Sequence, residues 1–283
     1  MFNKSKVSIV GLGFVGSSMN RSFSEKNVNI VAIYDKFKDG GIGNIANTLN
    51  SDISFWALPT IFNENTCLYD LEPIFEVSNY FSQNNYKGII IIKSTVTPET
   101  TEILSKEYPK LKFVHNPEFL TARTAYEDFH NQKHIVLGYN NNCNENDKQL
   151  LEKFYSAYYP DAEISTCNSL ESESMKIFVN CFYSVKVQYF NELYVLCQKN
   201  GASYDKIKDM MLKNGWINPM HTTVPGPDGK LSYGGLCFPK DTNALLNYMK
   251  SKNSDSKVLE ATVEERNNMR SDHDNCLKKP KIV

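Results

Sequence analysis

The 283-residue chain has almost no excess charge and no long apolar segment. Its formal net charge is −1, so it lacks the basic surplus with which proteins bind nucleic acid or an anionic membrane surface. The densest apolar run, Gly88–Ile92, ends at Lys93 and is far shorter than the ~18–20 apolar residues of a membrane span. We therefore expect neither nucleic acid nor a membrane as a partner.

Cysteine pairs are also missing. The chain has 7 cysteines, an odd number, and no C-x-x-C pair, which fits neither a disulfide framework nor a tetrahedral zinc site. The first apolar run, Val7–Val10, leads into closely spaced glycines without the cleavage pattern of a signal peptide. We predict a reduced, cytoplasmic protein without a metal site.

Short apolar runs alternate with polar or helical segments in the first 165 or so residues. They lie at residues 7–10, 28–34, 53–58, 89–92, 113–114 and 135–137. Continuous apolar runs of this kind are typical of parallel strands that are covered on both faces. The pattern predicts an α/β fold, a Rossmann-type doubly wound parallel sheet, over residues 1–167.

A different pattern begins after Cys167. Residues 170–200 contain neither Pro nor Gly and carry apolar residues at helical spacing, which predicts one long helix that Gly201 would cap. Shorter helices are predicted at 204–213, 241–250 and 258–270, with a Pro/Gly-rich loop at 215–235. We predict a helical dimerisation and catalytic domain over 168–283. The apolar residues of the long helix occupy more than one stripe, which favours a homodimer seam there; they include Ile177, Phe178, Phe182, Val185 and Tyr189.

A glycine-rich turn follows the first predicted strand and opens a helix. Its spacing, G-x-G-x-x-G, fits the tight turn, the backbone approach to a pyrophosphate and the close helix–strand packing of a dinucleotide site. The residues predicted to bind NAD are Gly11, Gly13, Phe14, Val15 and Gly16, with Asp35 at the end of the second strand as acceptor for the ribose hydroxyls. The alternative is a tight turn followed by a solvated Asp. Lys36 and Lys38 would tolerate a 2′-phosphate, so the preference for NAD over NADP could be incomplete.

Polar residues form a second pattern. Lys176 and Asn180 lie four residues apart on the long helix and therefore share a face, which either carries chemistry or is simply solvated. Glu173, Ser184 and Asn191 extend the same stripe. Cys237 follows two glycines and precedes Phe-Pro, a turn that a substrate could approach. Glu118 and Thr95 follow predicted strands, at the edge where open α/β sheets bind ligands.

These runs resemble the UDP-glucose/GDP-mannose dehydrogenase family. The resemblance is carried by G-G-x-C-F-P-K-D at 234–241, N-P-E-F-L at 116–120 and K-S-T-V at 93–96, together with the helix that holds Lys176 and Asn180. It implies that the C6 alcohol of a nucleotide sugar is oxidised to a carboxylate in two hydride transfers, with two NAD used per turnover. UDP-glucose, giving UDP-glucuronate, is the expected substrate. UDP-N-acetylmannosamine and GDP-mannose are the alternatives.

The resemblance also implies roles for individual residues. Cys237 would capture the aldehyde as a thiohemiacetal that is oxidised to a thioester, and Lys176, helped by Asn180, would stabilise the C6 oxyanion. Asp241 would act through water as general base, and Glu118 would aid thioester hydrolysis. Thr95 would organise water at the site and also bind the NAD cofactor. The expected substrate contacts are Glu118, Phe119, Leu120, Lys176, Asn180, Tyr233, Gly234 and Gly235.

The chain departs from the family pattern in four places, one of which is Ala122, where the family often has a second Glu four residues after the first. The third domain that usually covers the UDP moiety has no counterpart here, and the segment from Asp35 to Ile53 is short. Where the family has Arg-Ile-Gly, this chain has Trp216-Ile217-Asn218. The loop at 218–233, with His221 and Lys230, would either supply substitute diphosphate contacts or be an exposed loop.

Two rival functions remain. A one-step β-hydroxyacid dehydrogenase would share the Lys and Asn on the long helix, but a single hydride transfer needs no thioester and hence no Cys237. An inactive nucleotide-sugar-binding module would explain the missing domain. Degenerate enzymes usually lose the nucleophile or the lysine first, however, and both are present.

Overall fold

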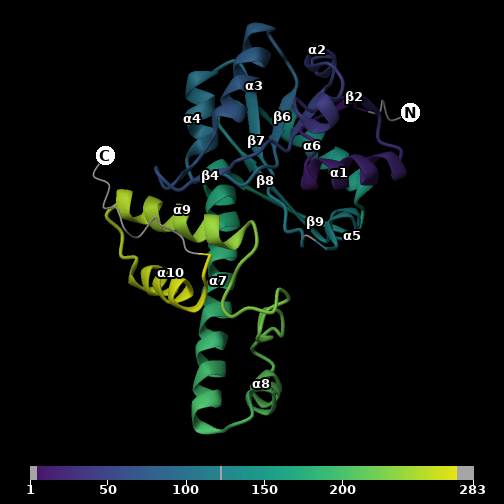
Figure 1. Cartoon of the computed structure of the whole chain (residues 1–283). Coiled ribbons are helices and arrows are strands. Elements are labelled where there is room, and N and C mark those ends of the chain that lie inside the picture. The colour runs from purple at the N-terminus through teal and green to yellow at the C-terminus, as the bar shows by residue number, and fades with distance from the viewer. Residues whose placement is uncertain (1–4, 122, 273–283) are drawn as a thin grey trace. The chain divides into compact units, whose positions relative to one another are not determined.

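The computed structural model describes residues 5–121 and 123–272 (Figure 1). Packing divides the chain into two compact units. Unit 1 consists of Met1–Ile61 and Tyr69–Lys176, and unit 2 consists of Phe62–Leu68 and Ile177–Val283. This division falls inside a single long helix, whereas the domain boundary after Cys167 that the sequence suggests stays a prediction.

Unit 1 is built on a seven-stranded sheet with the order β2-β1-β3-β6-β7-β8-β9. The strands are β1 (Val7–Val10), β2 (Ile30–Tyr34), β3 (Ile53–Trp56), β6 (Ile89–Ile92), β7 (Lys112–His115), β8 (His134–Tyr139) and β9 (Glu163–Asn168). Every neighbouring pair is parallel except β7 and β8. The Rossmann-type α/β fold predicted from the apolar runs is therefore confirmed. A separate two-stranded sheet joins β4 (Phe62–Asn63) to β5 (Leu68–Tyr69).

The expectation of a fully parallel sheet is wrong at one pair. β8 runs antiparallel to β7, with His115 opposite Gly138. In its described residues, the connection between them has one short helix, α5 (Ala125–His130), about 9 Å long at 1.5 Å per residue. To begin a strand parallel to β7, the chain would first have to cross back along the full length of that strand, which usually takes a full helix. The chain instead re-enters the sheet from the edge at which β7 ends, and β9, which the apolar runs did not predict, then pairs parallel to β8.

Helices cover both faces of the sheet in unit 1. They are α1 (Phe14–Glu25), α2 (Ile45–Thr48), α3 (Glu72–Gln83), α4 (Thr100–Glu107) and α6 (Glu145–Tyr158), with a 3₁₀ turn, η1, at Lys38–Gly40. One core contains Phe23, Phe55 and Phe154, and the other contains Trp56, Phe81 and Phe113. Successive strand residues alternate between these two cores because side chains on a strand point to opposite faces. Two buried faces explain why the strands are continuous apolar runs.

Unit 2 is helical. The predicted long helix is confirmed as α7 (Ser169–Asn200), whose first turns belong to unit 1. The three shorter predicted helices are confirmed as α8 (Tyr204–Leu212), α9 (Phe238–Ser251) and α10 (Lys257–Met269). The Pro/Gly-rich segment between α8 and α9 forms neither helix nor strand. A small core of Phe190, Cys197, Tyr204 and Val224 packs α7 against α8 and this loop.

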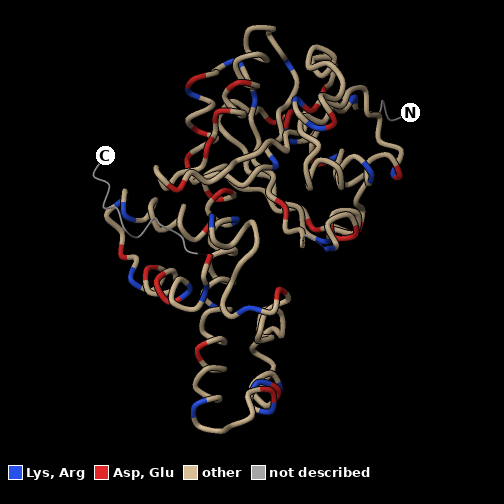
Figure 2. Tube along the Cα trace, viewed as in Figure 1, with Lys and Arg blue, Asp and Glu red and all other residues tan. Residues whose placement is uncertain are grey.

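Charged residues of both signs are interspersed along the trace of each unit (Figure 2). Within the ranges that the structure describes, no helix combines the length and the apolarity needed to cross a membrane.

Candidate functional site

The turn after β1 has the geometry that the glycine spacing predicts. Gly11 adopts φ +91°, and a Cβ there would lie 2.4 Å from the carbonyl oxygen of Ala57. A Cβ on Gly16 would lie 1.9 Å from the carbonyl oxygen of Gly11, so only glycine lets α1 pack this closely onto the strand. Gly13 precedes the first turn of α1, and a Cβ there would meet nothing within 4 Å. A backbone that is open on this side can approach a phosphate at the helix N-terminus.

Asp35 organises this turn. One carboxylate oxygen accepts a hydrogen bond from the N–H of Leu12 at 2.7 Å, and the other accepts from the N–H groups of Phe37 and Lys38 at 2.9 and 2.8 Å. Partial burial would raise the pKa of Asp35, but these three backbone donors hold it below its ordinary value. The group is therefore ionised at neutral pH and keeps acceptor capacity, because a carboxylate accepts about four hydrogen bonds.

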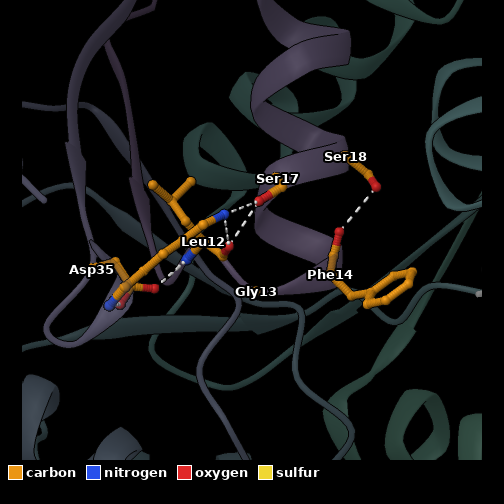
Figure 3. Close-up of a pocket in the computed structure, with 7 residues that line it drawn as sticks. Leu12, Gly13, Phe14, Ser17, Ser18 and Asp35 are labelled. Carbon is orange, nitrogen blue, oxygen red and sulfur yellow. Dashed lines mark hydrogen bonds between the residues drawn. The ribbon is translucent and has the colours of Figure 1, made fainter. Parts of the chain in front are cut away.

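A cleft of about 530 Å³ lies beside this turn (Figure 3). It is lined by Leu12, Gly13, Phe14, Ser17, Ser18, Asp35 and Lys38. Lys38 extends into the turn and donates from Nζ to the carbonyl oxygen of Leu12 at 2.8 Å and to Ser17 Oγ at 2.9 Å. Lys36 instead pairs with Glu76, at 2.7 Å. Of the two lysines flagged in the sequence, only Lys38 lines the cleft. A carboxylate beside an open helix N-terminus fits the adenosine half of NAD, and the role of Asp35 as ribose acceptor stays a prediction.

A second polar group lies where β6 and β7 end. The N–H of Asn116 donates to the carbonyl oxygen of Ile92 at 2.9 Å, which continues the ladder beyond both strands. Lys93 is buried there and donates from Nζ to Asn116 Oδ1 at 2.9 Å. Asn116 also donates to the carbonyl oxygen of Val136 at 2.7 Å, so its side chain is fixed at both ends.

Glu118, Phe119 and Lys176 extend this group within unit 1. Lys176 Nζ donates to the backbone carbonyl of Glu118 and lies 4.7 Å from the centre of the Phe119 ring. Burial raises the pKa of the Glu118 carboxyl, against the opposing effect of Lys93 and Lys176. Leu120 packs against the core beneath, and the carbonyl of Thr95 accepts a hydrogen bond from Thr60 Oγ1 at 2.8 Å. Predicted residues from three separate runs of sequence thus share one edge of the sheet.

Cys237 and Asp241 lie at the start of α9 in unit 2. Cys237 is exposed and precedes the first helical residue, and the N–H of Asp241 donates to the carbonyl oxygen of Cys237 at 3.0 Å. The Asp241 carboxylate is fully buried and accepts from Asn180 Nδ2 at 2.6 Å and from Lys240 Nζ at 2.6 Å. The thiol therefore stands at the positive end of a helix, a place that favours a thiolate, one turn before a fixed carboxylate.

The two glycines before Cys237 are required for different structural reasons. Gly235 adopts φ +80°, a left-handed conformation that favours glycine. At Gly234 a Cβ would lie 2.5 Å from the Arg270 guanidinium, which pairs with Asp228 at 2.7 Å. Tyr233 is buried. Arg270 holds the loop in place yet comes more than thirty residues later in the sequence, so no local pattern could identify it.

The polar stripe of α7 is buried, so its interpretation as a solvated surface is wrong. Lys176, Asn180, Ser184 and Asn191 all have little exposure. Asn191 Oδ1 accepts from the N–H of Ser232 at 2.8 Å, and Glu173 accepts from the N–H of Thr101 at 2.7 Å. The first of these bonds ties the loop before Cys237 to α7. A buried polar group is retained where such bonds satisfy it.

His221 and Lys230, which the sequence suggests as substitute diphosphate contacts, have different surroundings from each other. The His221 ring packs between Tyr183 and Phe238, with ring centres 4.7 and 5.5 Å apart. Burial, together with Lys186, lowers the pKa of His221, so the ring is neutral at pH 7 and poorly suited to bind a diphosphate. Lys230 is exposed, and Trp216 is 92% exposed.

The sheet, the glycine-rich turn and the acidic residue after β2 define a dinucleotide-binding α/β protein with a helical second unit. Residues 43–159 match the NAD binding domain of the UDP-glucose/GDP-mannose dehydrogenase family, and residues 170–268 match the central domain of that family. The chain belongs to the UDP-glucose/GDP-mannose dehydrogenase family, and its cofactor is NAD.

Individual relatives agree with this assignment. The chain is 32% identical over 205 residues to a UDP-glucose 6-dehydrogenase of Rickettsia bellii, a match that covers 69% of this chain but only 44% of the relative. It is 28% identical over 302 residues to a UDP-glucose 6-dehydrogenase of Campylobacter jejuni, covering 92% of this chain and 72% of the relative. The structure of a UDP-glucose dehydrogenase from Pyrobaculum islandicum is similar in fold, with a TM-score of 0.79 at 21% identity, covering 93% of this chain and 68% of that one.

Asp35→Asn tests the ribose acceptor. The substitution removes the charge but keeps one accepting oxygen for the turn, so we expect NAD affinity to fall about tenfold, the usual weight of one charge-assisted hydrogen bond. The preference over NADP should narrow because the 2′-phosphate no longer meets a carboxylate. Titration calorimetry with both cofactors measures this, and Lys36→Met, outside the cleft, should leave the ratio unchanged. A wild type that binds NADP more tightly would contradict the assignment.

Proposed function

We propose that this protein is a UDP-glucose 6-dehydrogenase, which oxidises UDP-glucose to UDP-glucuronate in the cytoplasm with two NAD per sugar. The observation that carries the proposal is the exposed Cys237 thiol at the N-terminus of α9, one turn before the buried Asp241 carboxylate. An oxidation that stops at the aldehyde has no use for such a nucleophile.

The first oxidation removes a proton and a hydride from the C6 alcohol. NAD, when bound, supplies the hydride acceptor. Lys176 stabilises the oxyanion that develops at O6, since a fixed cation near a forming alkoxide lowers the barrier. Asn180, one turn later on α7, orients the Asp241 carboxylate by its hydrogen bond of 2.6 Å. Asp241 receives the proton through water.

The second oxidation proceeds on Cys237. Its thiolate adds to the aldehyde carbon, the aldehyde oxygen takes a proton, and a thiohemiacetal forms. Loss of a second hydride, to a second NAD, and of a second proton, through water, gives a thioester. Water then attacks the acyl carbon, the C–S bond breaks, and the carboxylate and the thiol are released. We assign Glu118 as the base that takes the proton of this water and Thr95 as the residue that orients the water. We assign the remaining substrate contacts to Phe119, Leu120, Tyr233, Gly234 and Gly235.

The choice of UDP-glucose rests on the UDP-glucose 6-dehydrogenases to which the chain is similar, and those relatives are longer proteins. The chain spans less than half the length of its Rickettsia bellii relative. UDP-N-acetylmannosamine and GDP-mannose remain the alternative substrates, because the chemistry at C6 is the same. A binding module without activity would not need a thiol at a helix N-terminus together with a buried lysine.

The exposed face of α7 supports a homodimer. Phe178, Phe182, Tyr189 and Leu196 are each more than half exposed, at intervals of four and seven residues that keep them on one side of the helix. The stripe covers about 27 Å of helix at 1.5 Å per residue. Monomeric proteins rarely leave such a patch in water. A second copy that packs its own stripe against it, about a two-fold axis, would bury it.

Cys237→Ser tests the thioester. A serine hydroxyl is a far poorer nucleophile at neutral pH than a thiolate, and oxygen esters hydrolyse more slowly than thioesters. We expect the variant to bind the nucleotide sugar but to lose nearly all steady-state turnover. A stoichiometric burst of NADH, or an acyl-enzyme seen by mass spectrometry, should remain, and Lys176→Ala should suppress even the burst.

Cys167→Ser, which changes a half-buried thiol on β9, is the matched control and should turn over normally. Normal turnover by Cys237→Ser would overturn the thioester mechanism and favour a single-hydride dehydrogenase.

Phe182→Glu tests the dimer. A charge on the apolar stripe should shift the assembly from dimer to monomer in sedimentation equilibrium. Gln198→Glu places the same charge on an exposed position almost opposite the stripe and should leave the dimer intact. A wild type that stays monomeric at high concentration would show that this seam does not exist.

A further inference from the structure

Lys93 is a charged residue in an apolar place. It follows the four isoleucines of β6, and only 2% of its surface is exposed. Its Nζ lies 5.6 Å from the centre of the Phe129 ring and donates one hydrogen bond, to Asn116. Burial lowers the pKa of Lys93, although the Glu118 carboxylate opposes this shift. A buried ammonium is costly unless a nearby negative charge compensates for it.

The surroundings fix this ammonium. Asn116 Oδ1 accepts from both Lys93 and the Tyr155 hydroxyl, while Asn116 Nδ2 donates to Val136. The amide cannot turn without breaking these bonds. Lys93 therefore holds a set position beside Asn116, which precedes Glu118 by two residues in the segment after β7.

Glu118 is the negative group whose charge acts on this ammonium. Among the described residues, no hydrogen-bond partner is present for its buried Oε2. Lys176 bonds the backbone carbonyl of Glu118 rather than its carboxylate. The carboxylate thus depends on long-range attraction to Lys93 and Lys176 to remain charged against the cost of burial.

The other titratable groups nearby do not supply the positive charge that Lys93 provides. Burial, with Lys93 and Lys176, lowers the pKa of His115 to about 3, so this imidazole is neutral. Its Nδ1 is hydrogen-bonded with Ser172 Oγ at 2.8 Å. Burial raises the pKa of the Tyr155 hydroxyl, which also stays neutral. Among the described residues of unit 1, Lys93 and Lys176 are the cations whose charges lower the pKa of Glu118.

We propose that Lys93 is a positioning residue whose fixed ammonium keeps the Glu118 carboxylate ionised for the hydrolytic step. This rests on the proposed function. In the proposed mechanism Lys176 stabilises the C6 oxyanion, whereas Lys93 stabilises the ionised form of the Glu118 carboxylate. When water attacks the thioester, its proton moves to Glu118, the C–S bond breaks, and the electron pair leaves with sulfur. A protonated Glu118 cannot take that proton, so the charge of Lys93 sets the lowest pH at which hydrolysis runs.

Direct titration of Glu118 tests the inference without relying on activity. The protein is labelled with ¹³C at the glutamate carboxyl carbons, and Glu118→Gln identifies the resonance. Lys93→Met removes the charge and the hydrogen bond to Asn116, whereas Lys93→Gln removes the charge but keeps a donor. Because a positive neighbour lowers a carboxyl pKa, both variants should raise the titration midpoint of Glu118 by about one pH unit or more.

Lys112→Met is the matched control. It removes a lysine that pairs with Asp147 at 2.7 Å, at the start of β7 and away from its carboxyl end, and it should not move the Glu118 midpoint. An unchanged midpoint in both Lys93 variants, a shift in Lys93→Met alone, or an equal shift in Lys112→Met would each overturn the proposal.

Turnover separates this inference from the proposed function. If both hold, the acidic limb of the kcat profile moves to higher pH in Lys93→Gln, while KM for the nucleotide sugar changes little. If no nucleotide sugar is oxidised, the proposed function fails, yet the shifted carboxyl midpoint still shows that Lys93 sets the charge of Glu118.

Discussion

The placement of polar chemistry in unit 1 depends on four parallel strands that end at one edge of a sheet buried on both faces. Within β1, β3, β6 and β7 nearly every side chain is buried, and the glycine-rich turn, Lys93 and Glu118 come after the last residues of these strands. Backbone bonds from Ala57 to Val10, from Lys93 to Trp56 and from Asn116 to Ile92 continue the ladder there. The glycine-rich turn, Lys93 and Glu118 lie at this edge because the strands that precede them end there.

Unit 2 holds its chemistry by burial of polar groups. Asp241 is fixed by Asn180 and Lys240, and the loop before Cys237 is fixed by Arg270 behind Gly234. A nucleophile on a flexible loop would lose the orientation that covalent catalysis requires. Here the thiol is exposed while the groups that position its turn are buried, which suits a residue that must meet substrate without moving.

Much of this could be predicted from the sequence because the signals are local. The strands and the long helix follow from apolar periodicity, and Gly11, Gly13 and Gly16 follow from the backbone geometry that a phosphate site needs. Non-local features could not be predicted. The antiparallel entry of β8 depends on the length of α5, the burial of the α7 stripe depends on loop contacts such as Asn191 with Ser232, and the Lys93–Asn116 bond joins residues from different strands. A lysine at the end of a four-isoleucine strand was the one local sign of that pair.

If one sugar is oxidised twice, the ratio of NADH formed to nucleotide sugar consumed should reveal it. The assay would run the purified protein to completion with limiting UDP-glucose, UDP-N-acetylmannosamine or GDP-mannose and excess NAD, and would identify the product by mass spectrometry. We expect two NADH per UDP-glucose and a carboxylate product. One NADH per sugar, with an aldehyde or ketone product, would contradict the proposed double oxidation.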